Sequence, residues 1–185
     1  MKRIYVFIPI LALLAGLTLT GCSKESDDPT NQLSAGKTKS EIKNLALYLS
    51  SQYTNGYEYY FELVSDGISF GKDGTFQGAG SYVEFMVVSS VNDGIASGDY
   101  VFDEAGTAPV FTYSGARHCM DWTKAGPNLR TYITSGTLSV TRDNSNYQIS
   151  FSGLDSDGKK VTAYYNGSSL FYDWLNTKGS SSPAR

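Results

Sequence analysis

The chain has 185 residues, of which 15 are basic and 18 acidic, and its formal net charge at pH 7 is −3. A mildly acidic chain without a run of basic residues lacks the positive face that nucleic-acid binding needs, so we expect no nucleic-acid partner. Fourteen tyrosines, nine phenylalanines and 19 glycines are typical of many short strands joined by glycine-containing turns. The composition therefore predicts an all-β protein.

The first 21 residues have the pattern of an export leader. Lys2 and Arg3 form a basic start, and residues 4–19 are almost wholly apolar. This run is shorter than a typical membrane-spanning helix. We therefore predict that residues 1–21 are a signal peptide.

The leader ends in Leu19-Thr20-Gly21-Cys22, which resembles the lipobox of bacterial lipoproteins. In that family the leader is cut before the cysteine, and the resemblance implies that Cys22 carries acyl chains that anchor the protein to a membrane. Ser23 in place of aspartate implies sorting to the outer membrane. The acids that follow resemble the export signal of Bacteroidota-type surface lipoproteins and imply a location on the cell exterior; they are Glu25, Asp27 and Asp28.

Three further regions follow the leader. Residues 22–40 are polar apart from Leu33, so we expect the lipidated cysteine to be followed by a flexible tether. Residues 41–175 are numerous enough for one β domain with its own core. Residues 176–185 are expected to form a disordered tail. Apart from the lipidated cysteine, Cys119 is the only cysteine, so we expect no disulfide within the chain.

The predicted strands begin in a segment that suits either a helix or a strand, residues 42–49. We favour a strand from about Leu45, because it runs into Asn55-Gly56, the strongest short hairpin signal. In the next segment, residues 57–63, aromatic residues alternate with Glu58 and Glu62, which we expect on the solvated side. A small hairpin turning at Asp73-Gly74 and a longer strand over residues 81–91 follow.

Residues 103–132 are the least regular part of the pattern and contain the only histidine, His118. Its neighbour Cys119 would point to the opposite side of a strand, which argues against a catalytic dyad. A free cysteine is more often a small buried apolar residue. One histidine and one cysteine are too few for a zinc site, and we expect no metal and no cofactor.

The clearest alternation of apolar and polar residues lies in three successive segments, residues 135–140, 147–151 and 161–166. Short turns rich in Asn, Asp and Gly separate these segments. The pattern predicts three hairpin-linked antiparallel strands.

Eight to ten strands in sequential hairpins predict an up-and-down antiparallel meander closed into a barrel, because closure removes exposed edges. A two-sheet β-sandwich is the alternative. Several turn and strand motifs, namely Gly98-Asp99-Tyr100, Ser135-Gly136-Thr137-Leu138-Ser139-Val140, Asp157-Gly158-Lys159 and Tyr165-Asn166-Gly167, give the chain a further resemblance. It is similar to uncharacterised calycin-like (lipocalin-like) barrel domains of Bacteroidota-type lipoproteins. The resemblance implies the fold and no particular activity.

Three functions fit this pattern. The first is a non-enzymatic module that binds a glycan or a small apolar molecule at one mouth of the barrel. The second is a structural or accessory subunit of an outer-membrane complex, with a protein partner there. The third is a hydrolase that uses two carboxylates; the candidates are Glu58, Glu62, Glu84, Asp99, Asp103 and Asp121.

For the binding module we predict a ligand site made of polar and aromatic side chains, which are Arg117, His118, Asp121, Trp122, Tyr172 and Trp174. The preferred alternative for the two tryptophans is that they plug or cover the barrel, because tryptophan is mostly buried. Other aromatic residues are expected to fill the interior; they are Tyr57, Tyr59, Phe61, Tyr147, Phe151 and Tyr165.

Overall fold

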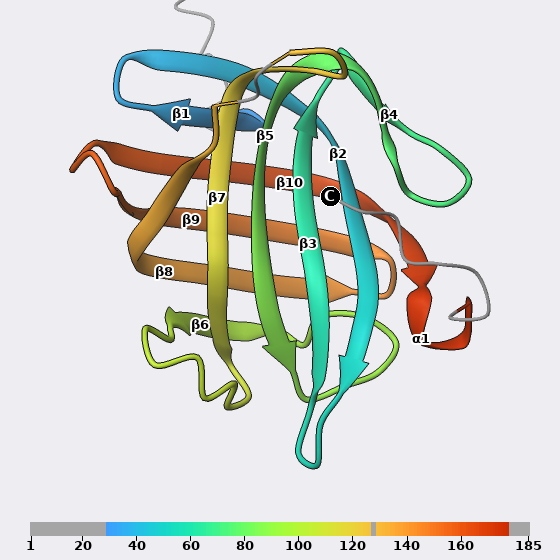
Figure 1. Cartoon of the computed structure of the whole chain (residues 1–185). Helices are drawn as coiled ribbons and strands as arrows, with labels where there is room; N and C mark the ends of the chain where they lie inside the picture. The colour runs from blue at the N-terminus through green and yellow to red at the C-terminus, as the bar shows by residue number, and fades with distance from the viewer. Residues whose placement is uncertain (1–28, 127–128, 178–185) are drawn as a thin grey trace, which may run out of the picture.

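A computed structural model describes residues 29–126 and 129–177. The predicted signal peptide, the lipidation site at Cys22 and residues 178–185 of the predicted tail lie outside the described residues. The described chain forms ten strands and one short helix (Figure 1). They are β1 Gln32–Ala35, β2 Thr38–Gln52, β3 Tyr57–Ser65, β4 Ile68–Phe70, β5 Phe76–Ser89, β6 Gly98–Phe102, β7 Thr112–Thr123, β8 Thr131–Asp143, β9 Asn146–Asp155, β10 Lys160–Asp173 and α1 Trp174–Thr177.

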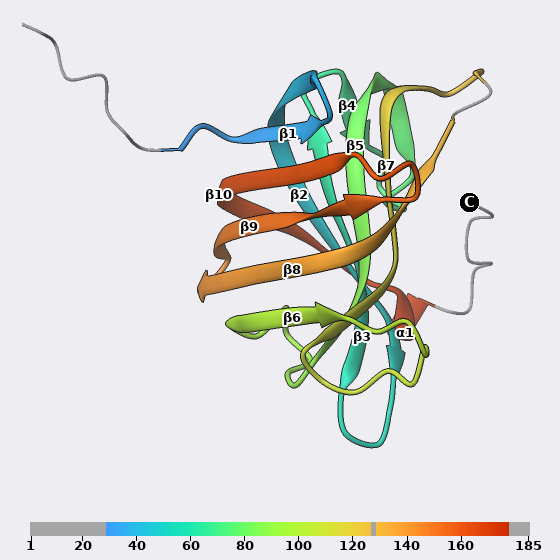
Figure 2. The same cartoon turned by 90° about the vertical axis from the view of Figure 1, so that its left-hand side faces the viewer.

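The ten strands belong to one sheet with the order β3-β2-β1-β10-β9-β8-β6-β7-β5-β4, and a further pairing of β3 with β5 joins the sheet into a ring. Most pairs are antiparallel; β2 with β10 and β6 with β7 are parallel. Strands β2, β3, β5 and β7 form one layer, and β6, β8, β9 and β10 run across them in the other (Figures 1 and 2). The prediction of an all-β barrel of eight to ten strands is confirmed, because the hydrogen bonds of the sheet run in a ring. The resulting barrel is uneven in shape.

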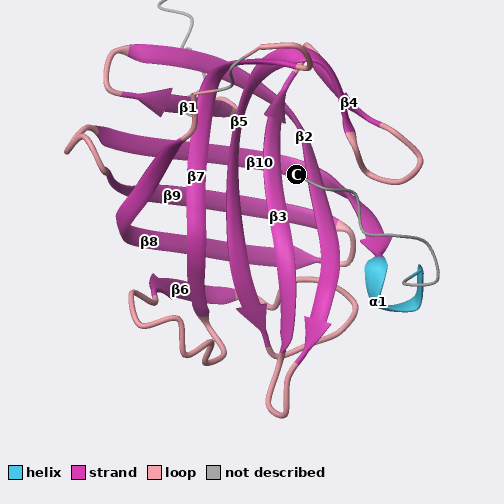
Figure 3. Ribbon diagram, viewed as in Figure 1, coloured by secondary structure: helices cyan, strands magenta, loops and turns pink. Residues whose placement is uncertain are grey.

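The helix α1 is the only helical element in the described residues (Figure 3). Among these residues, no helix has the length and apolar character needed to cross a membrane. Strand β2 confirms the choice of a strand over a helix in residues 42–49. The Asn55-Gly56 hairpin also forms, with the Tyr53 amide donating to the Gly56 carbonyl over 2.8 Å.

The β domain begins earlier in the chain than the sequence predicts. Strand β1 and the start of β2 occupy residues 32–40, so the prediction of a flexible tether is wrong for this part. The physical reason is that β1 pairs on both sides, with β2 and with β10, and buries Leu33 completely. Two ladders of backbone hydrogen bonds therefore hold a segment whose own apolar content is small.

The segment predicted to be least regular contains β7, one of the longer strands. The prediction of irregular structure is therefore wrong for residues 112–123. Strand β7 is held by β5 along most of its length and by β6 and β8 at short stretches of its other edge. Its main partner, β5, lies 24 or more positions earlier in the chain, so the local pattern does not reveal the strand.

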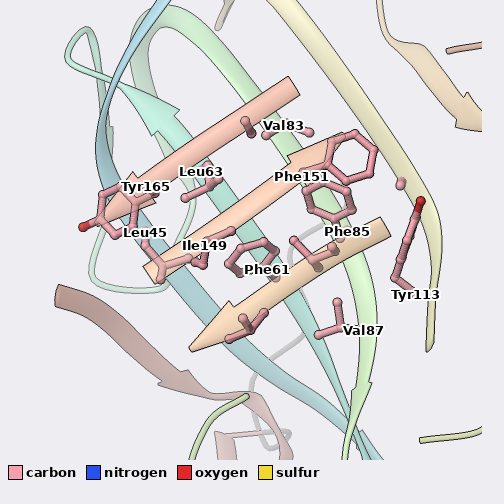
Figure 4. Close-up of a cluster of buried hydrophobic side chains, with 14 of the residues drawn as sticks. Leu45, Phe61, Leu63, Val83, Phe85, Val87, Tyr113, Ile149, Phe151 and Tyr165 are labelled. Carbon is pink, nitrogen blue, oxygen red and sulfur yellow. The ribbon is translucent and has the colours of Figure 1, made fainter. Parts of the chain in front are cut away.

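Large apolar side chains fill the space between the two layers (Figure 4). Of the six aromatic residues predicted to lie inside, five are buried and Tyr57 packs against them while partly exposed. Phe85 and Phe151 lie with their ring centroids 5.0 Å apart, and Phe85 also meets Phe61 at 5.6 Å. The interior is therefore a packed core.

The outer face of β3, β5 and β7, together with β4, carries a second apolar cluster. It contains Val64, Ile68, Tyr82, Cys119 and Trp122, with Phe70 and Phe76 packed against them. The expectation that Glu62 lies on a solvated side is wrong, because its side chain is fully buried. Its cross-strand neighbours Ala46 and Glu84 are buried too, so this part of the outer face is shielded from water.

Candidate functional site

The six residues predicted to form a ligand site do not converge on one place. Four of them lie on β7, where Arg117 points to the outer face beside Glu84 and His118 points inward beside Val83. Cys119 points outward again and is buried, as expected for an unreactive thiol. Burial raises the pKa of this thiol, which disfavours the nucleophilic thiolate.

Arg117 is engaged in an ion pair on the outer face. Its Nε donates to Oε1 of Glu84 over 2.6 Å, between the neighbouring strands β7 and β5. Burial alone would lower the pKa of the Arg117 guanidinium, but the Glu84 carboxylate raises it above its usual value. The arginine side chain thus serves first to neutralise a buried carboxylate.

His118 lies inside the barrel and binds Asp155 at the end of β9. The His118 Nε2 and Asp155 Oδ2 atoms are 3.2 Å apart, and since an ionised carboxylate only accepts, Nε2 carries the proton. The other oxygen of Asp155 accepts from the amides of Asp157 and Lys159 in the next turn. Burial alone would raise the pKa of Asp155, but these amides and His118 hold it below its usual value. The contact fastens the β9–β10 turn to β7.

Trp122 is buried beneath the β4–β5 hairpin. Its indole meets the Phe76 ring edge-on at 5.4 Å, and Phe76 meets Phe70 at 5.6 Å. Asp121, next to it, is exposed. Trp122 therefore covers the outside of the barrel, which agrees with the preferred alternative for this residue.

Tyr172 and Trp174 lie at the other end of the same row of rings. Both contact Tyr48, with centroid distances of 4.9 and 4.5 Å, and Phe70 meets Tyr48 at 6.4 Å. The Tyr48 hydroxyl donates to the Gly74 carbonyl over 2.9 Å and so fixes the tip of the β4–β5 hairpin. Trp122 and Trp174 therefore do not touch each other but are connected by the rings that lie between them. Ligand binding by this row of rings stays a prediction.

One end of the barrel is held closed by the loop of residues 90–97. The Tyr59 hydroxyl donates to the Val91 carbonyl and accepts from the Gly94 amide, at 3.2 and 3.1 Å. The Tyr147 hydroxyl accepts from Ile95, which is fully buried. The hydroxyl of Tyr100 donates to the carbonyl of Ala96, and burial raises the pKa of this phenol to about 12. Three core tyrosines thus bind one loop across the mouth.

The most exposed large apolar side chains at the opposite end are Leu129, Tyr132 and Leu154, whose exposed fractions are 75%, 59% and 46%. Tyr132 and Leu154 lie on the neighbouring strands β8 and β9. This exposed group is not recognisable from the sequence, because Leu129 and Tyr132 lie in the segment without clear alternation and Leu154 stands at the end of β9, just before a turn.

Among the carboxylates considered for hydrolysis, Glu62 and Glu84 lie directly opposite each other on β3 and β5. Both side chains are buried, so neither is exposed to a substrate. Within the part of the chain that the structure describes, no three His, Cys, Asp or Glu side chains gather closely enough to hold a metal ion.

Comparisons of the chain with protein-family models, curated proteins and solved structures found no match. What the fold establishes is a mostly-β protein with a single ten-stranded sheet closing into a ring.

Proposed function

We propose that this chain is a lipid-anchored protein of the Bacteroidota type, located on the outer membrane and facing the cell exterior. Its domain would be a calycin-like barrel that binds a ligand without catalysis. The proposed cellular location rests on the sequence alone, namely the apolar leader and the lipobox-like residues that end at Cys22. The binding role rests on the domain.

The observation that carries the binding role is the contrast between a packed interior and an exposed apolar group on the outer wall. Inside, Phe85 contacts both Phe61 and Phe151, and the loop of residues 90–97 closes one mouth. A barrel of this size holds either side chains or one small ligand. Because side chains fill the interior, we place the ligand on the outer surface. A surface site favours a glycan over a small apolar molecule, which would need an interior cavity.

The exposed residues Leu129, Tyr132 and Leu154 favour a surface contact. Scattered exposed apolar side chains are normal, but an aromatic and two leucines at one end suit a partner. A glycan would stack on the Tyr132 ring. The same group also favours the second candidate, in which the domain is an accessory subunit of an outer-membrane complex.

The binding role is tested by a thermal-shift screen of residues 23–185 against neutral and charged polysaccharides, fatty acids and bile acids. A ligand at 100 times its dissociation constant stabilises the fold by about 2.7 kcal/mol. For a domain of this size that raises Tm by roughly 5–15 °C. Stabilisation by fatty acids alone would contradict a surface glycan site, and a flat screen would favour the accessory-subunit role.

The lipid anchor and the cellular location are tested separately, in cells that make the full chain. An alkyne analogue of palmitate should label the wild-type protein, and Cys22→Ala should abolish the label. Protease added to intact cells should degrade a protein that faces the exterior. Labelling that persists in Cys22→Ala would contradict the anchor, and protection from protease would place the domain in the periplasm.

A further inference from the structure

Basic residues that are far apart in the chain meet at one end of the barrel. Three turns come together there, between β1 and β2, between β9 and β10, and before β8 (Figure 2). The Gly36 amide donates to the Lys160 carbonyl over 2.9 Å, and the Ser156 amide donates to the Tyr132 carbonyl over 2.8 Å. These bonds bring together five exposed cations, here called the basic corner: Lys37, Lys39, Arg130, Lys159 and Lys160.

Four of the five cations of the basic corner form no ion pair with a described residue. Within the described residues, no acidic side chain lies within ion-pair distance of Lys37, Lys39, Arg130 or Lys160. Lys159 pairs with Asp157, and both side chains are more than half exposed. A surface pair of this kind contributes little to stability and exchanges readily for another anion.

Five acidic residues lie toward the other end of the barrel, in and around the β2–β3 hairpin, the loop of residues 90–97 and β6. They are Glu58, Asp93, Asp99, Asp103 and Glu104, whereas Glu41, Asp155 and Asp157 lie beside the basic corner. The end with β6 therefore carries mainly negative charge, while cations outnumber acids around the basic corner. A negatively charged partner is attracted to one end and repelled by the other.

The spacing of the basic corner follows from the sheet. Strands β8, β9, β10, β1 and β2 are consecutive neighbours, and neighbouring strands lie about 4.8 Å apart. The corner thus extends over about 20 Å, with Arg130 near its β8 end and Lys39 at its β2 end. Such a row suits a linear polyanion better than a single small anion.

The ring of Tyr132 lies in this row, two residues after Arg130, and is 59% exposed. Leu154 adds an apolar surface beside Lys160, its partner in the β9–β10 ladder. A flat aromatic ring beside cations suits a sugar ring that carries a carboxylate or sulfate. Lysine is depleted in protein interfaces, so a corner rich in lysine argues for a glycan over a protein.

We propose that the basic corner, with Tyr132, binds a linear anionic glycan that carries carboxylate or sulfate groups. This inference rests on the proposed binding function and adds the ligand class and the site. Because the contacts are exposed ion pairs, binding weakens as salt rises.

The test measures binding of residues 23–185 to polygalacturonate, dextran sulfate and neutral dextran of matched length, by calorimetry at low and at physiological salt. We expect binding to the two anionic polymers and none to dextran. Lys160→Glu should weaken binding about two- to fivefold, the amount expected for the loss of one exposed contact. The matched control is Lys72→Glu, which makes the same charge change at an exposed lysine of the β4–β5 loop outside the corner and should leave affinity unchanged.

A second variant separates glycan recognition from general attraction to anions. Tyr132→Ala should weaken binding to polygalacturonate while leaving binding to inorganic polyphosphate, which has no sugar ring, unchanged. Equal binding of neutral and anionic glycans would overturn the inference and leave the proposed function standing. Binding to none of the glycans would overturn both the inference and the proposed glycan-binding function. Binding to anionic vesicles alone would show that the basic corner contacts a membrane surface and not a glycan.

Discussion

The Nε2 atom of His118 and the Oδ2 atom of Asp155 lie 3.2 Å apart inside the barrel, although the residues are 37 positions apart in the chain. Asp155 also accepts hydrogen bonds from two amides of the following turn. We predict that Asp155→Asn lowers the free energy of unfolding by about 1–3 kcal/mol, because the His118 ring and the two turn amides lose their ionised acceptor. Denaturant unfolding measures this. Asp157→Asn, which removes an exposed carboxylate, is the control and should cost less than about 1 kcal/mol.

The same carboxylate predicts a pH dependence. Because the pKa of Asp155 is lower in the folded state, its stabilising contribution is fully present above its unfolded pKa of about 4 and is lost as pH falls through the folded value. The stability difference between wild type and Asp155→Asn should therefore be large at pH 6 and shrink toward pH 2. A difference that stays constant over this range would contradict the role given to the ionised carboxylate.

The hydroxyl of Tyr113 is buried without a hydrogen-bond partner among the described residues. Its ring packs edge-on against the rings of Phe85 and Phe151, with centroid distances of 5.4 and 6.0 Å (Figure 4). We predict that Tyr113→Phe raises the free energy of unfolding by about 1 kcal/mol, because an unsatisfied polar group leaves the core. Tyr100→Phe removes a hydroxyl that bonds Ala96 and should lower stability by a similar amount. A loss of stability in Tyr113→Phe would show that its hydroxyl has a partner.

Gly74 allows the tip of the β4–β5 hairpin to approach Tyr48. It has a φ of 81°, and an added Cβ would lie 2.2 Å from Cε1 of the buried Tyr48 ring. We predict that Gly74→Ala lowers stability by about 2–5 kcal/mol and exposes Trp122, which shifts tryptophan emission to longer wavelength. Gly158→Ala is the matched control, because Gly158 has a similar φ of 74° but a Cβ added there would meet no atom within 4 Å. It should cost only about 1–2 kcal/mol of backbone strain, with unchanged emission. Equal effects of the two would contradict the packing of the hairpin on Tyr48.

Strand β1 should be required for folding. A chain that begins at Glu41 lacks the two ladders of β1 and the buried Leu33, whereas a chain that begins at Pro29 keeps them. We predict that the shorter chain loses about 3 kcal/mol or more and associates through the uncovered edge of β10. Thermal unfolding and size-exclusion chromatography of the two chains measure this. Equal stability would mean that β1 is dispensable and that the domain begins near residue 41.

The sequence predicted the C-terminal strands well, because their alternation is local. Leu138, Val140, Ile149 and Phe151 are buried as expected, on hairpin-linked strands. Strand β1 was missed because its single leucine gives no pattern, and its pairing with β10 is made across most of the chain.

The candidate site was harder to predict than the fold. The adjacency of His118 and Cys119 indicated opposite faces, and this is confirmed. The partners of Arg117 and His118 are 33 and 37 positions away, so no local signal names them. The basic corner is assembled from three separate turns, each with few charges, and they meet because β8, β9, β10, β1 and β2 are consecutive neighbours in the sheet.

The position of β1 also constrains when this protein can fold. Asn31 exchanges two hydrogen bonds with Asn166, 135 positions later, so β1 can pair with β2 early but meets β10 only when nearly the whole chain is present. Contacts of such separation make folding slow, because loop-closure entropy is lost before they form. A chain emerging end-first from a ribosome or a translocation channel therefore has to remain incomplete until β10 has emerged. The two-sided pairing of β1 is therefore completed among the last steps of folding.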